Sequence, residues 1–342
     1  MKFENNLLIH GDNIKGLHYL LDERGLARKI DLVYIDPPFA TKCSFVVSEG
    51  RASTISHSRT GEVAYDDLLV GRDFVEFIRA RLVLLKELLS EQGSLYLHTD
   101  YKIGHYLKVM MDEVFGERNF RNDITRIKCN PKNFARIGYG NIKDMILFYT
   151  KGKCPIWNEP RQSYSDEEIM RLFPKVDPKG RRYTTVPIHA PGETQSARPF
   201  KGMMPPVGRH WRTDVEILEK WDKEGLIEWS AKGNPRKIVY VEGREGKRVQ
   251  DVWTDFKDPQ YPSYPTEKNS AMLDLLIQTS SNADSIVLDC FCGSGTTLDA
   301  AERNGRHWIG IDSSDAAIRA TKKKLHLTEE LSFSPVEEIV LC

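Results

Sequence analysis

The sequence predicts an α/β protein built on a mostly parallel β-sheet, with a separate region inserted into it. Two stretches of the chain predict the sheet, because strands and helices alternate over residues 7–35 and again over residues 285–312. A helix that connects two neighbouring strands in this way leaves them parallel. The insertion is predicted from about residue 151 to residue 252, where the alternation is lost and prolines, aromatic residues and basic residues mix.

The first half of the chain supplies apolar runs of strand length at regular intervals. Strands are expected at residues 7–10, 30–35, 94–98, 124–127 and 145–149. Helices are expected at residues 14–21, from residue 74 to a stop at Gly93, and up to about residue 115. Residues 40–65 hold many Ser, Thr and Gly and show little periodicity, so we expect a long loop there.

The last quarter of the chain repeats the pattern. Helices are expected at about residues 271–279, 297–305 and 314–325, and strands at residues 285–289 and 307–312. One further helix, at about residues 214–225, interrupts the irregular middle region. Because ligands of open α/β sheets bind at the carboxyl ends of the strands, the residues that follow each strand are the candidates for a site.

The tetrapeptide Asp36-Pro37-Pro38-Phe39 follows one of these strands directly. Neither proline has an N–H, so the strand must end there and the chain must turn. A carboxylate is thereby fixed at the carboxyl end of a buried strand, with an aromatic ring three residues later. Taken alone, the tetrapeptide is equally compatible with a proline-rich turn without a function, and other motifs must decide.

A second motif, the segment from Asp289 to Thr297 with glycines at positions 293 and 295, joins a predicted strand to a predicted helix. Glycines at such a turn let the backbone approach a ligand closely. Asp312 ends the following strand, about 20 residues later, where a carboxylate can bind the hydroxyls of a ribose. Leu298 stands where a dinucleotide fingerprint needs its third glycine, so a nicotinamide cofactor is disfavoured. The motif predicts a ligand that carries a ribose, and S-adenosylmethionine fits.

Together the two motifs resemble the catalytic and cofactor motifs of the amino-group DNA methyltransferases, which methylate adenine N6 or cytosine N4. The segment Tyr264-Pro265-Thr266-Glu267-Lys268 is similar to that family's Tyr-Pro-Thr-Gln-Lys-Pro segment, and residues 306–312 are similar to its ribose-binding strand. The tetrapeptide precedes the glycines by about 250 residues, which is the order of the family's β class. Methyltransferases that act on a protein glutamine have the opposite order and are disfavoured.

The resemblance implies a Rossmann-like methyltransferase sheet shared between the two ends of the chain. Residues 1–150 would form its catalytic half, residues 151–252 an inserted target-recognition region, and residues 253–342 its cofactor-binding half. The implied catalytic residues are Asp36, Pro37, Pro38 and Phe39. The implied S-adenosyl-L-methionine site comprises Asp12, Thr266, Lys268, Asp289, Phe291, Gly293, Gly295, Thr296 and Asp312, with the alternative that Asp12 and Thr266 are plain helix caps. Glu267, Asn269 and Cys290 depart from the family's motifs, but no required carboxylate or glycine is lost.

The implied reaction is methyl transfer to adenine N6 in duplex DNA, with the target base flipped out of the helix. Phe39 would stack on the base, while the Asp36 carboxylate and the Pro37 carbonyl would accept the hydrogens of its amino group. Cytosine N4 is the alternative target, although an aspartate at position 36 favours adenine. A catalytically silent nucleic-acid-binding module is a further alternative, and RNA is an alternative substrate. No metal is expected, because the methyl donor is already activated.

Composition and charge bound the remaining choices. Basic and acidic residues balance over the 342 residues, at 49 each, but residues 118–250 hold 27 basic against 16 acidic side chains. A basic region interleaved with aromatic rings suits contact with DNA phosphates and bases. The six cysteines are scattered without zinc-site spacing. We expect a cytoplasmic protein, since no apolar run reaches the roughly 18 residues of a membrane span and the first residues lack an apolar signal region.

The expected partner is duplex DNA. The resemblance adds two further partners, a cognate restriction endonuclease and a second copy of the chain in a homodimer.

Overall fold

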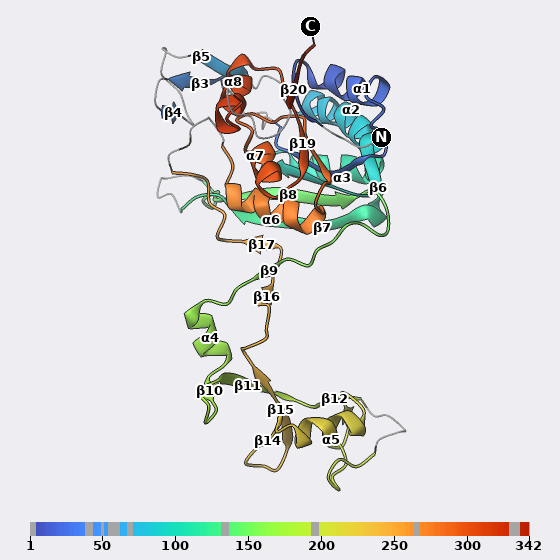
Figure 1. The fold of residues 1–342 in the computed structure, drawn as a ribbon, viewed down its shortest axis with the longest axis vertical. Coiled ribbons are helices and arrows are strands. Elements are labelled where there is room, and N and C mark those ends of the chain that lie inside the picture. Colours follow the sequence, from blue (N-terminus) through green and yellow to red (C-terminus); the bar gives the residue numbers. More distant parts are fainter. Residues whose placement is uncertain are drawn as a thin grey trace. The chain divides into compact units, whose positions relative to one another are not determined.

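The structure is a computed structural model, and it describes residues 5–37, 44–48, 51–53, 62–66, 71–130, 137–192, 198–260, 262, 267–327 and 336–341. Two compact units account for the chain (Figure 1). Unit 1 consists of residues Met1–Pro160 and Gln250–Cys342, and unit 2 consists of residues Arg161–Val249. No helix in the described part of the chain is long and apolar enough to cross a membrane.

Unit 1 is built on a nine-stranded sheet. In spatial order its strands are β17 (Val252–Trp253), β7 (Phe120–Ile127), β8 (Lys143–Thr150), β6 (Leu89–Thr99), β2 (Ile30–Ile35), β18 (Ile286–Asp289), β19 (His307–Asp312), β1 (Asn6–His10) and β20 (Val336–Val340). Among these strands β8 alone runs antiparallel to its neighbours. The predicted mostly parallel α/β sheet is therefore confirmed, and residues from both ends of the chain build it.

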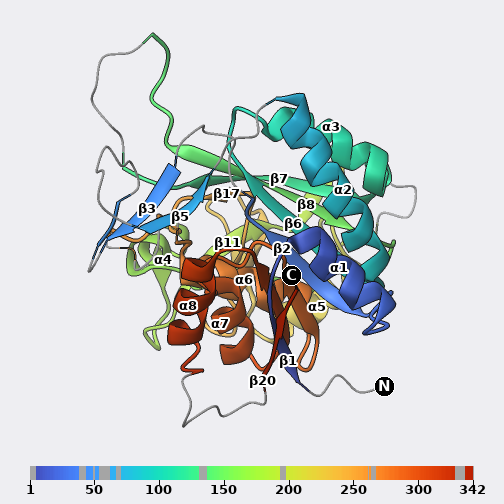
Figure 2. The ribbon, with the colours of Figure 1, turned by 90° about the horizontal axis from the view of Figure 1, so that it is seen from above.

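Helices cover both faces of this sheet. One face carries α1 (Asn13–Asp22), α2 (Arg72–Leu88) and α3 (Gly104–Phe115), and the other carries α6 (Ser270–Ser280), α7 (Thr296–Arg303) and α8 (Asp315–Lys324) (Figure 2). A short 3-10 helix, η1 (Glu117–Asn119), leads into β7. Two covered faces explain why the central strands carry long apolar runs rather than a regular alternation with polar residues.

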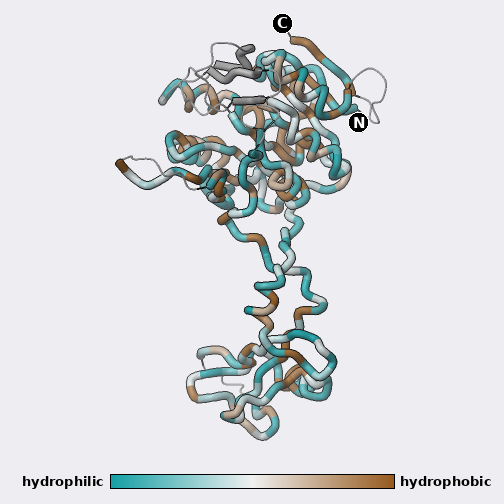
Figure 3. The backbone as a smooth tube through the Cα atoms, turned by 90° about the vertical axis from the view of Figure 1, so that its left-hand side faces the viewer, coloured by the Kyte–Doolittle hydropathy of each residue, from teal (hydrophilic) through white to brown (hydrophobic). Residues whose placement is uncertain are grey.

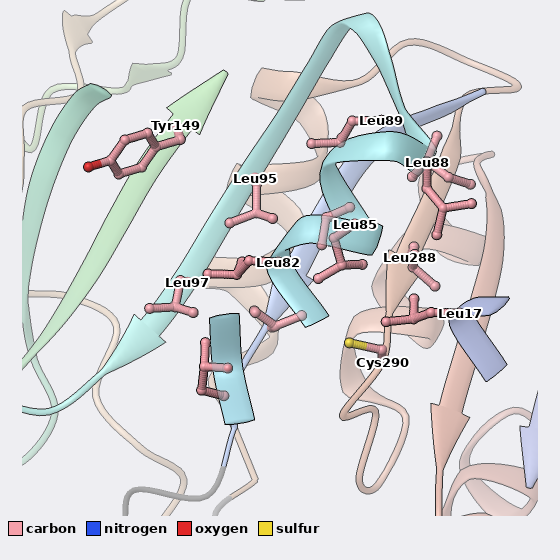
Figure 4. Packing of buried hydrophobic residues seen from close by; sticks show 14 of the residues in the cluster. Leu17, Leu82, Leu85, Leu88, Leu89, Leu95, Leu97, Tyr149, Leu288 and Cys290 are labelled. Atoms are coloured by element: carbon pink, nitrogen blue, oxygen red, sulfur yellow. The ribbon is translucent and has the colours of Figure 1, made fainter. Parts of the chain in front are cut away.

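The register of the central strands decides which side chains face which layer of helices. Leu95 and Leu97 of β6 pack in one buried cluster with leucines of α2, such as Leu82 (Figure 4). Tyr96 lies between them in sequence and faces the other layer, where its hydroxyl lies 2.7 Å from Ser280 Oγ of α6. Burial of each leucine contributes about 1.5–3 kcal/mol. A shift of one residue would exchange the two faces, so the register is strongly fixed.

The expected end of the second helix at Gly93 is wrong. The helix ends at Leu88, and Gly93 lies inside β6. A side chain at position 93 would meet close neighbours, because a Cβ atom there would lie 2.7 Å from Leu89 Cδ2 and 3.0 Å from the Ile30 carbonyl oxygen. The glycine is needed for close packing beside β2 rather than for helix termination.

The loop expected over residues 40–65 is also corrected. This stretch contains β3 (Ser44–Ser48), β4 (Arg51–Ser53) and β5 (Glu62–Asp66), which form a three-stranded antiparallel sheet. Polar or charged residues stand at both ends of each of these short strands, so no strand pattern stands out. Strand β20 was not predicted for the same reason, since Glu337 and Glu338 lie at its centre.

Unit 2 explains why the alternation of strands and helices is lost. Its largest sheet has four antiparallel strands, in the order β10 (Lys175–Val176), β11 (Arg182–Pro187), β15 (Pro235–Tyr240) and β14 (Ile227–Trp229). Two strand pairs join β12 (His189–Pro191) to β13 (Arg209–Trp211) and β9 (Arg161–Gln162) to β16 (Lys247–Arg248). The helices are α4 (Asp166–Leu172) and α5 (Val215–Lys223), as expected in the second case.

The core of unit 2 is small. Its buried cluster comprises Ile188, Phe200, Trp211 and Leu218, and hydrophilic residues predominate along the chain of this unit (Figure 3). Residues 161–249 carry 18 basic against 13 acidic side chains.

Candidate active site

The carboxyl edge of the sheet in unit 1 gathers carboxylates from three adjacent parallel strands. Asp36 directly follows β2, Asp289 ends β18 and Asp312 ends β19. The fold thereby brings the residue predicted to be catalytic to the same edge as two residues predicted to bind the cofactor. This is the edge at which ligands bind in open α/β sheets.

Asp36 forms an ion pair with Lys268, which precedes α6. The distance from Asp36 Oδ2 to Lys268 Nζ is 2.6 Å, and the side chains are 15% and 10% exposed, respectively. The other carboxylate oxygen, Oδ1, is buried and has no hydrogen-bond partner among the residues that the structure describes. A buried oxygen without a donor is costly. The arrangement therefore suits a ligand that supplies an N–H or O–H donor to Asp36.

The glycine loop between β18 and α7 is held by backbone contacts and by Asp312. Gly293 has φ +52° and Gly295 has φ +75°, both in the left-handed region that favours glycine. The Gly293 N–H donates to Asp312 Oδ2 at 2.9 Å, and the Gly293 carbonyl accepts from Thr321 Oγ1 at 2.9 Å. A Cβ atom at Gly295 would lie 2.9 Å from the Thr321 side chain. Both glycines are thus required by the shape of the loop.

Asp312 can serve a ribose while it holds this loop. Its Oδ1 accepts the Ser314 N–H at 2.9 Å and its Oδ2 accepts the Gly293 N–H. Each carboxylate oxygen has two lone pairs, so both retain capacity to accept a hydroxyl donor. Burial raises the pKa of Asp312, although the backbone donors oppose that shift. The donor set fits a nucleoside ribose at this position.

Asp289 is almost fully buried, with 2% of its surface exposed. Burial raises its pKa to about 7, and the nearby negative charge of Asp36 adds to the shift. Its Oδ1 accepts the Phe291 N–H at 3.0 Å. A cationic group bound beside Asp289 would relieve this cost, because it favours the ionised carboxylate. The amino group at the methionine end of S-adenosyl-L-methionine is such a cation.

Asp12 is a helix cap in this structure. Its Oδ1 accepts the N–H groups of Ile14 and Lys15 at the start of α1, at 3.0 and 3.2 Å. Its Oδ2 lies 3.7 Å from a guanidinium nitrogen of Arg81. Asp12 therefore caps α1, as the alternative interpretation expects. A role for Asp12 in binding the cofactor stays a prediction.

Asn13 and Arg81 belong to the same edge but were not predicted. Arg81 Nε donates to Asn13 Oδ1 at 2.6 Å, and Asn13 Nδ2 donates to the Cys290 carbonyl at 3.0 Å. Arg81 also lies over the Phe77 ring, 3.3 Å from its centroid, and Phe77 contacts Phe291. These contacts fasten the glycine loop to α1 and α2. The sequence signal was an arginine placed beside the apolar stripe of α2.

Two departures from the expected motifs have local partners. Glu267 forms an ion pair with Lys324 of α8, and Lys324 also donates to Thr296 Oγ1 at 2.9 Å. The residue that replaces a glutamine is thereby neutralised by a lysine of α8. Burial raises the pKa of both Cys290 and Cys292, so their thiols stay protonated and no nucleophilic cysteine is available at the loop.

A family model for N6/N4 DNA methylases matches residues 30–323. The chain belongs to this DNA methylase family. The methylase is 41% identical over 326 residues to the type II methyltransferase M.EcaI of Enterobacter cloacae, covering 93% of this chain and 69% of that one. It is 24% identical over 415 residues to the EcoP15I Mod subunit, a type III restriction-modification enzyme of Escherichia coli, covering 96% of this chain and 63% of that one.

Among solved structures, the methylase is similar to the cytosine-N4-specific PvuII DNA methyltransferase. The TM-score is 0.53 at 12% sequence identity, covering 97% of this chain and 90% of that one. At this identity the likeness shows the fold alone, and it confirms the Rossmann-like methyltransferase sheet. Family membership identifies S-adenosyl-L-methionine as the cofactor, and the donors at Asp289, Asp312 and the glycine loop fit that molecule.

The structure brings most of the predicted site residues of the methylase to one edge. Asp36, Lys268, Asp289, Gly293, Gly295 and Asp312 meet there, with Phe291 and Thr296 in the loop and first turn that follow β18. Pro37 directly follows Asp36. Pro38, Phe39 and Thr266 lie outside the described residues. The roles assigned to all of these side chains remain predictions.

Proposed function

We propose that this methylase transfers a methyl group from S-adenosyl-L-methionine to the N6 amino group of adenine in duplex DNA. The observation that carries the proposal is the state of Asp36. One of its oxygens is paired with Lys268, and the other is buried without a donor among the described residues. An exocyclic amino group of a flipped base supplies the missing donor.

The cofactor supplies an activated methyl group on a sulfonium sulfur. Transfer would form a bond between that methyl carbon and N6 and break the bond to sulfur, which leaves S-adenosyl-L-homocysteine, and the amino nitrogen would then lose one proton to solvent. Asp36 accepts one N–H of the amino group, which orients the nitrogen lone pair toward the methyl carbon. The negative charge of Asp36 also stabilises the positive charge that develops on nitrogen. Pro37 contributes its carbonyl oxygen as the acceptor for the second N–H.

The aspartate at position 36 favours adenine over cytosine as the target base. The cytosine-N4 members of the amino-group DNA methyltransferases more often carry serine at the corresponding position. Cytosine N4 remains the second candidate, since it is also an exocyclic amine and the same contacts would serve it. Hydrolysis of methylated DNA to nucleosides separates the two. N6-methyl-2′-deoxyadenosine as the product supports the proposal, and N4-methyl-2′-deoxycytidine would replace it with the second candidate.

Unit 2 is the part that we assign to DNA recognition. Its basic surplus and its position between the two halves of the catalytic unit in sequence support this role. The relatives named above are a type II methyltransferase and a type III restriction-modification subunit. On that basis a cognate restriction endonuclease is the partner that we propose.

The test compares two aspartates at opposite ends of β2, Asp31 within the strand and Asp36 directly after it. Asp36→Asn removes the catalytic charge with little change in shape, and we expect loss of methyl transfer with retained cofactor binding. Asp31→Asn is the matched control, because Asp31 lies at the opposite end of β2, where it accepts a hydrogen bond from Ser90 Oγ at 2.9 Å. Transfer of labelled methyl groups to DNA measures the activity. An Asp36→Asn enzyme with the activity of the Asp31→Asn enzyme would overturn the proposal.

A further inference from the structure

A row of buried polar side chains crosses three strands behind the catalytic edge. Tyr34 of β2, His98 of β6 and Asp144 of β8 are 2%, 0% and 3% exposed. The Tyr34 hydroxyl lies 2.8 Å from His98 Nδ1, and His98 Nε2 lies 3.3 Å from Asp144 Oδ2. None of these residues belongs to the site described above, and buried polar groups of this kind are costly unless they are fully satisfied.

The register of the sheet places this row beside Asp36. Tyr34 pairs with Tyr96, so His98, two residues further along β6, faces the same layer as Tyr34. Asp36 is two residues beyond Tyr34 along the same chain, and side chains two residues apart in extended backbone point to the same face. The charge of Asp36 acts on both Tyr34 and His98. The row is therefore a direct neighbour of the catalytic carboxylate.

One protonation pattern satisfies the hydrogen bonds from Tyr34 to His98 and from His98 to Asp144. Asp144 is held as an anion by Lys128 Nζ at 2.7 Å and by Arg126 at 3.4 Å. An anionic Asp144 needs a donor, so His98 carries its hydrogen on Nε2 and accepts the Tyr34 hydroxyl on Nδ1. Burial lowers the pKa of His98 and raises that of Tyr34, so the ring stays neutral and the phenol stays protonated. Charged groups acting on His98 are Asp36, Asp144 and Lys268.

The far end of the row contacts Phe256 and Asp258, which flank Lys257. The Lys257 carbonyl accepts a hydrogen bond at 2.8 Å from Asn269, the neighbour of Lys268. Arg126 is fully buried, and its Nε donates to the Phe256 carbonyl at 2.6 Å. Another of its nitrogens lies 2.5 Å from Asp258 Oδ1. Phe256 and Asp258 lie between β17 and Lys268 in the chain. The same row thus contacts β2, which leads to Asp36, and the segment that leads to Lys268.

We propose that His98 is a positioning residue for methyl transfer, which holds through Tyr34 the end of β2 that carries Asp36 and through Asp144 and Arg126 the segment that carries Lys268. His98 makes no contact with the target base in this proposal. It fixes the distance and orientation of the Asp36–Lys268 pair through these neighbouring side chains. The inference rests on the proposed function, because it assigns Asp36 the role of accepting the amino group.

The test removes one hydroxyl from each of two buried tyrosines in register on adjacent strands. Tyr34→Phe deletes the donor to His98, while Tyr96→Phe deletes a hydroxyl that contacts only Ser280 among the described hydrogen-bond partners. We expect both variants to lower the melting temperature to a similar degree. The single-turnover rate of methyl transfer should fall about ten-fold or more for Tyr34→Phe, because small displacements of reacting groups cost up to about 100-fold in rate. The rate of Tyr96→Phe should stay within about two-fold of the wild type, since its substitution displaces no reacting group.

A double variant tests whether Tyr34 and His98 act together. If Tyr34 and His98 act through the same hydrogen bond, the double variant Tyr34→Phe/His98→Asn should be no slower than the slower of the two single variants. The KM for DNA and the Kd for S-adenosyl-L-methionine should stay within about two-fold of the wild-type values in all of them, because no binding contact is removed. Equal rates for Tyr34→Phe and Tyr96→Phe would overturn the inference, as would multiplicative losses in the double variant. If His98→Asn does not fold, the comparison of the two tyrosines decides alone.

Asp36→Asn, measured in the same assay, separates this inference from the proposed function. An inactive Asp36→Asn enzyme together with a Tyr34→Phe enzyme at the wild-type rate would overturn the role of His98 alone. An Asp36→Asn enzyme at the wild-type rate would overturn both.

Discussion

The carboxylate of Asp36 and the ammonium of Lys268 lie 2.6 Å apart, although the two residues come from opposite ends of the chain. The pair joins the strand of the catalytic motif to the segment before α6, and both side chains are largely buried. Its geometry means that the negative charge of Asp36 is balanced by a cation within the protein. Removal of either partner leaves the other charge buried.

Lys268→Gln should destabilise the methylase by about 3–5 kcal/mol, the usual cost of a buried charge left without its partner. The double variant with Asp36→Asn should recover most of that loss, because neither charge then remains. Urea unfolding of the wild type, both single variants and the double variant gives the coupling directly. A double variant less stable than either single one would contradict the pairing. Lys257→Gln is the matched control, since Lys257 is exposed, contacts Asn130 Oδ1 and lies in the same segment.

Arg126→Met should be among the most destabilising substitutions in the chain, at about 3–5 kcal/mol. The side chain is fully buried, and its loss leaves Asp144 with one cation fewer and the Phe256 carbonyl without a donor. Arg303→Met provides the comparison, because Arg303 also pairs with two aspartates but is 43% exposed. Its loss should cost about 1 kcal/mol or less. Denaturant midpoints of the two variants and the wild type measure the loss of stability. Equal losses for Arg126→Met and Arg303→Met would contradict the prediction that burial determines the cost.

The contrast between Asp36 and His98 shows what the sequence could and could not predict. Asp36 and the two glycines stand in short local motifs, where prolines or glycines constrain the backbone within a few residues. The row of Tyr34, His98 and Asp144 has no local signature, because each residue comes from a different strand and looks like an isolated polar residue in an apolar run. Only the register of the sheet brings them together.

The same reasoning applies to the fold. The central strands were predicted because burial on both faces makes them apolar, as in Ile30–Ile35. Strand β20 pairs with β1 at an edge, carries two glutamates and was missed. Edge strands need only one apolar face, so their sequences resemble loops.

Gly295→Ala should weaken cofactor binding as well as stability. Both Gly295 and Gly305 have a positive φ, +75° and +71°, so an alanine at either position costs about 1–2 kcal/mol in backbone strain. At Gly295 the new Cβ would also lie 2.9 Å from the Thr321 side chain, whereas at Gly305 nothing lies within 4 Å. Calorimetric titration with S-adenosyl-L-methionine should show a weaker Kd for Gly295→Ala and an unchanged Kd for Gly305→Ala. Equal affinities would remove the glycine loop from the cofactor site.

Affinity for S-adenosyl-L-methionine should rise with pH and level off above about pH 7. Burial raises the pKa of Asp289 to about 7 from an ordinary value of 3.8, so the carboxyl is protonated below that pH and cannot pair with a cation. Between about pH 4 and pH 7 the native protein holds a proton that the unfolded chain has lost, so the contribution of Asp289 to stability falls as the pH rises through that window. Titrations in buffers of different ionisation enthalpy measure the proton released on binding. Asp289→Asn should abolish this release, and a release that persists in the variant would assign it to another group.

Excision of unit 2 should leave a folded methyltransferase unit that binds its cofactor but no longer methylates DNA. The ends of unit 2 are adjacent, because β9 and β16 pair antiparallel with Arg161 opposite Arg248, and paired residues lie only about 5 Å apart. A short Gly-Ser linker can therefore replace residues 161–249 without strain on unit 1, whose nine-stranded sheet contains no strand from unit 2. Cofactor affinity should stay within about three-fold of the wild-type value, since no predicted cofactor residue is removed. Gel-shift and methylation assays on duplex DNA should show weak, salt-sensitive binding and no methylated product. Sequence-specific methylation by the shortened protein would place target recognition in unit 1 instead.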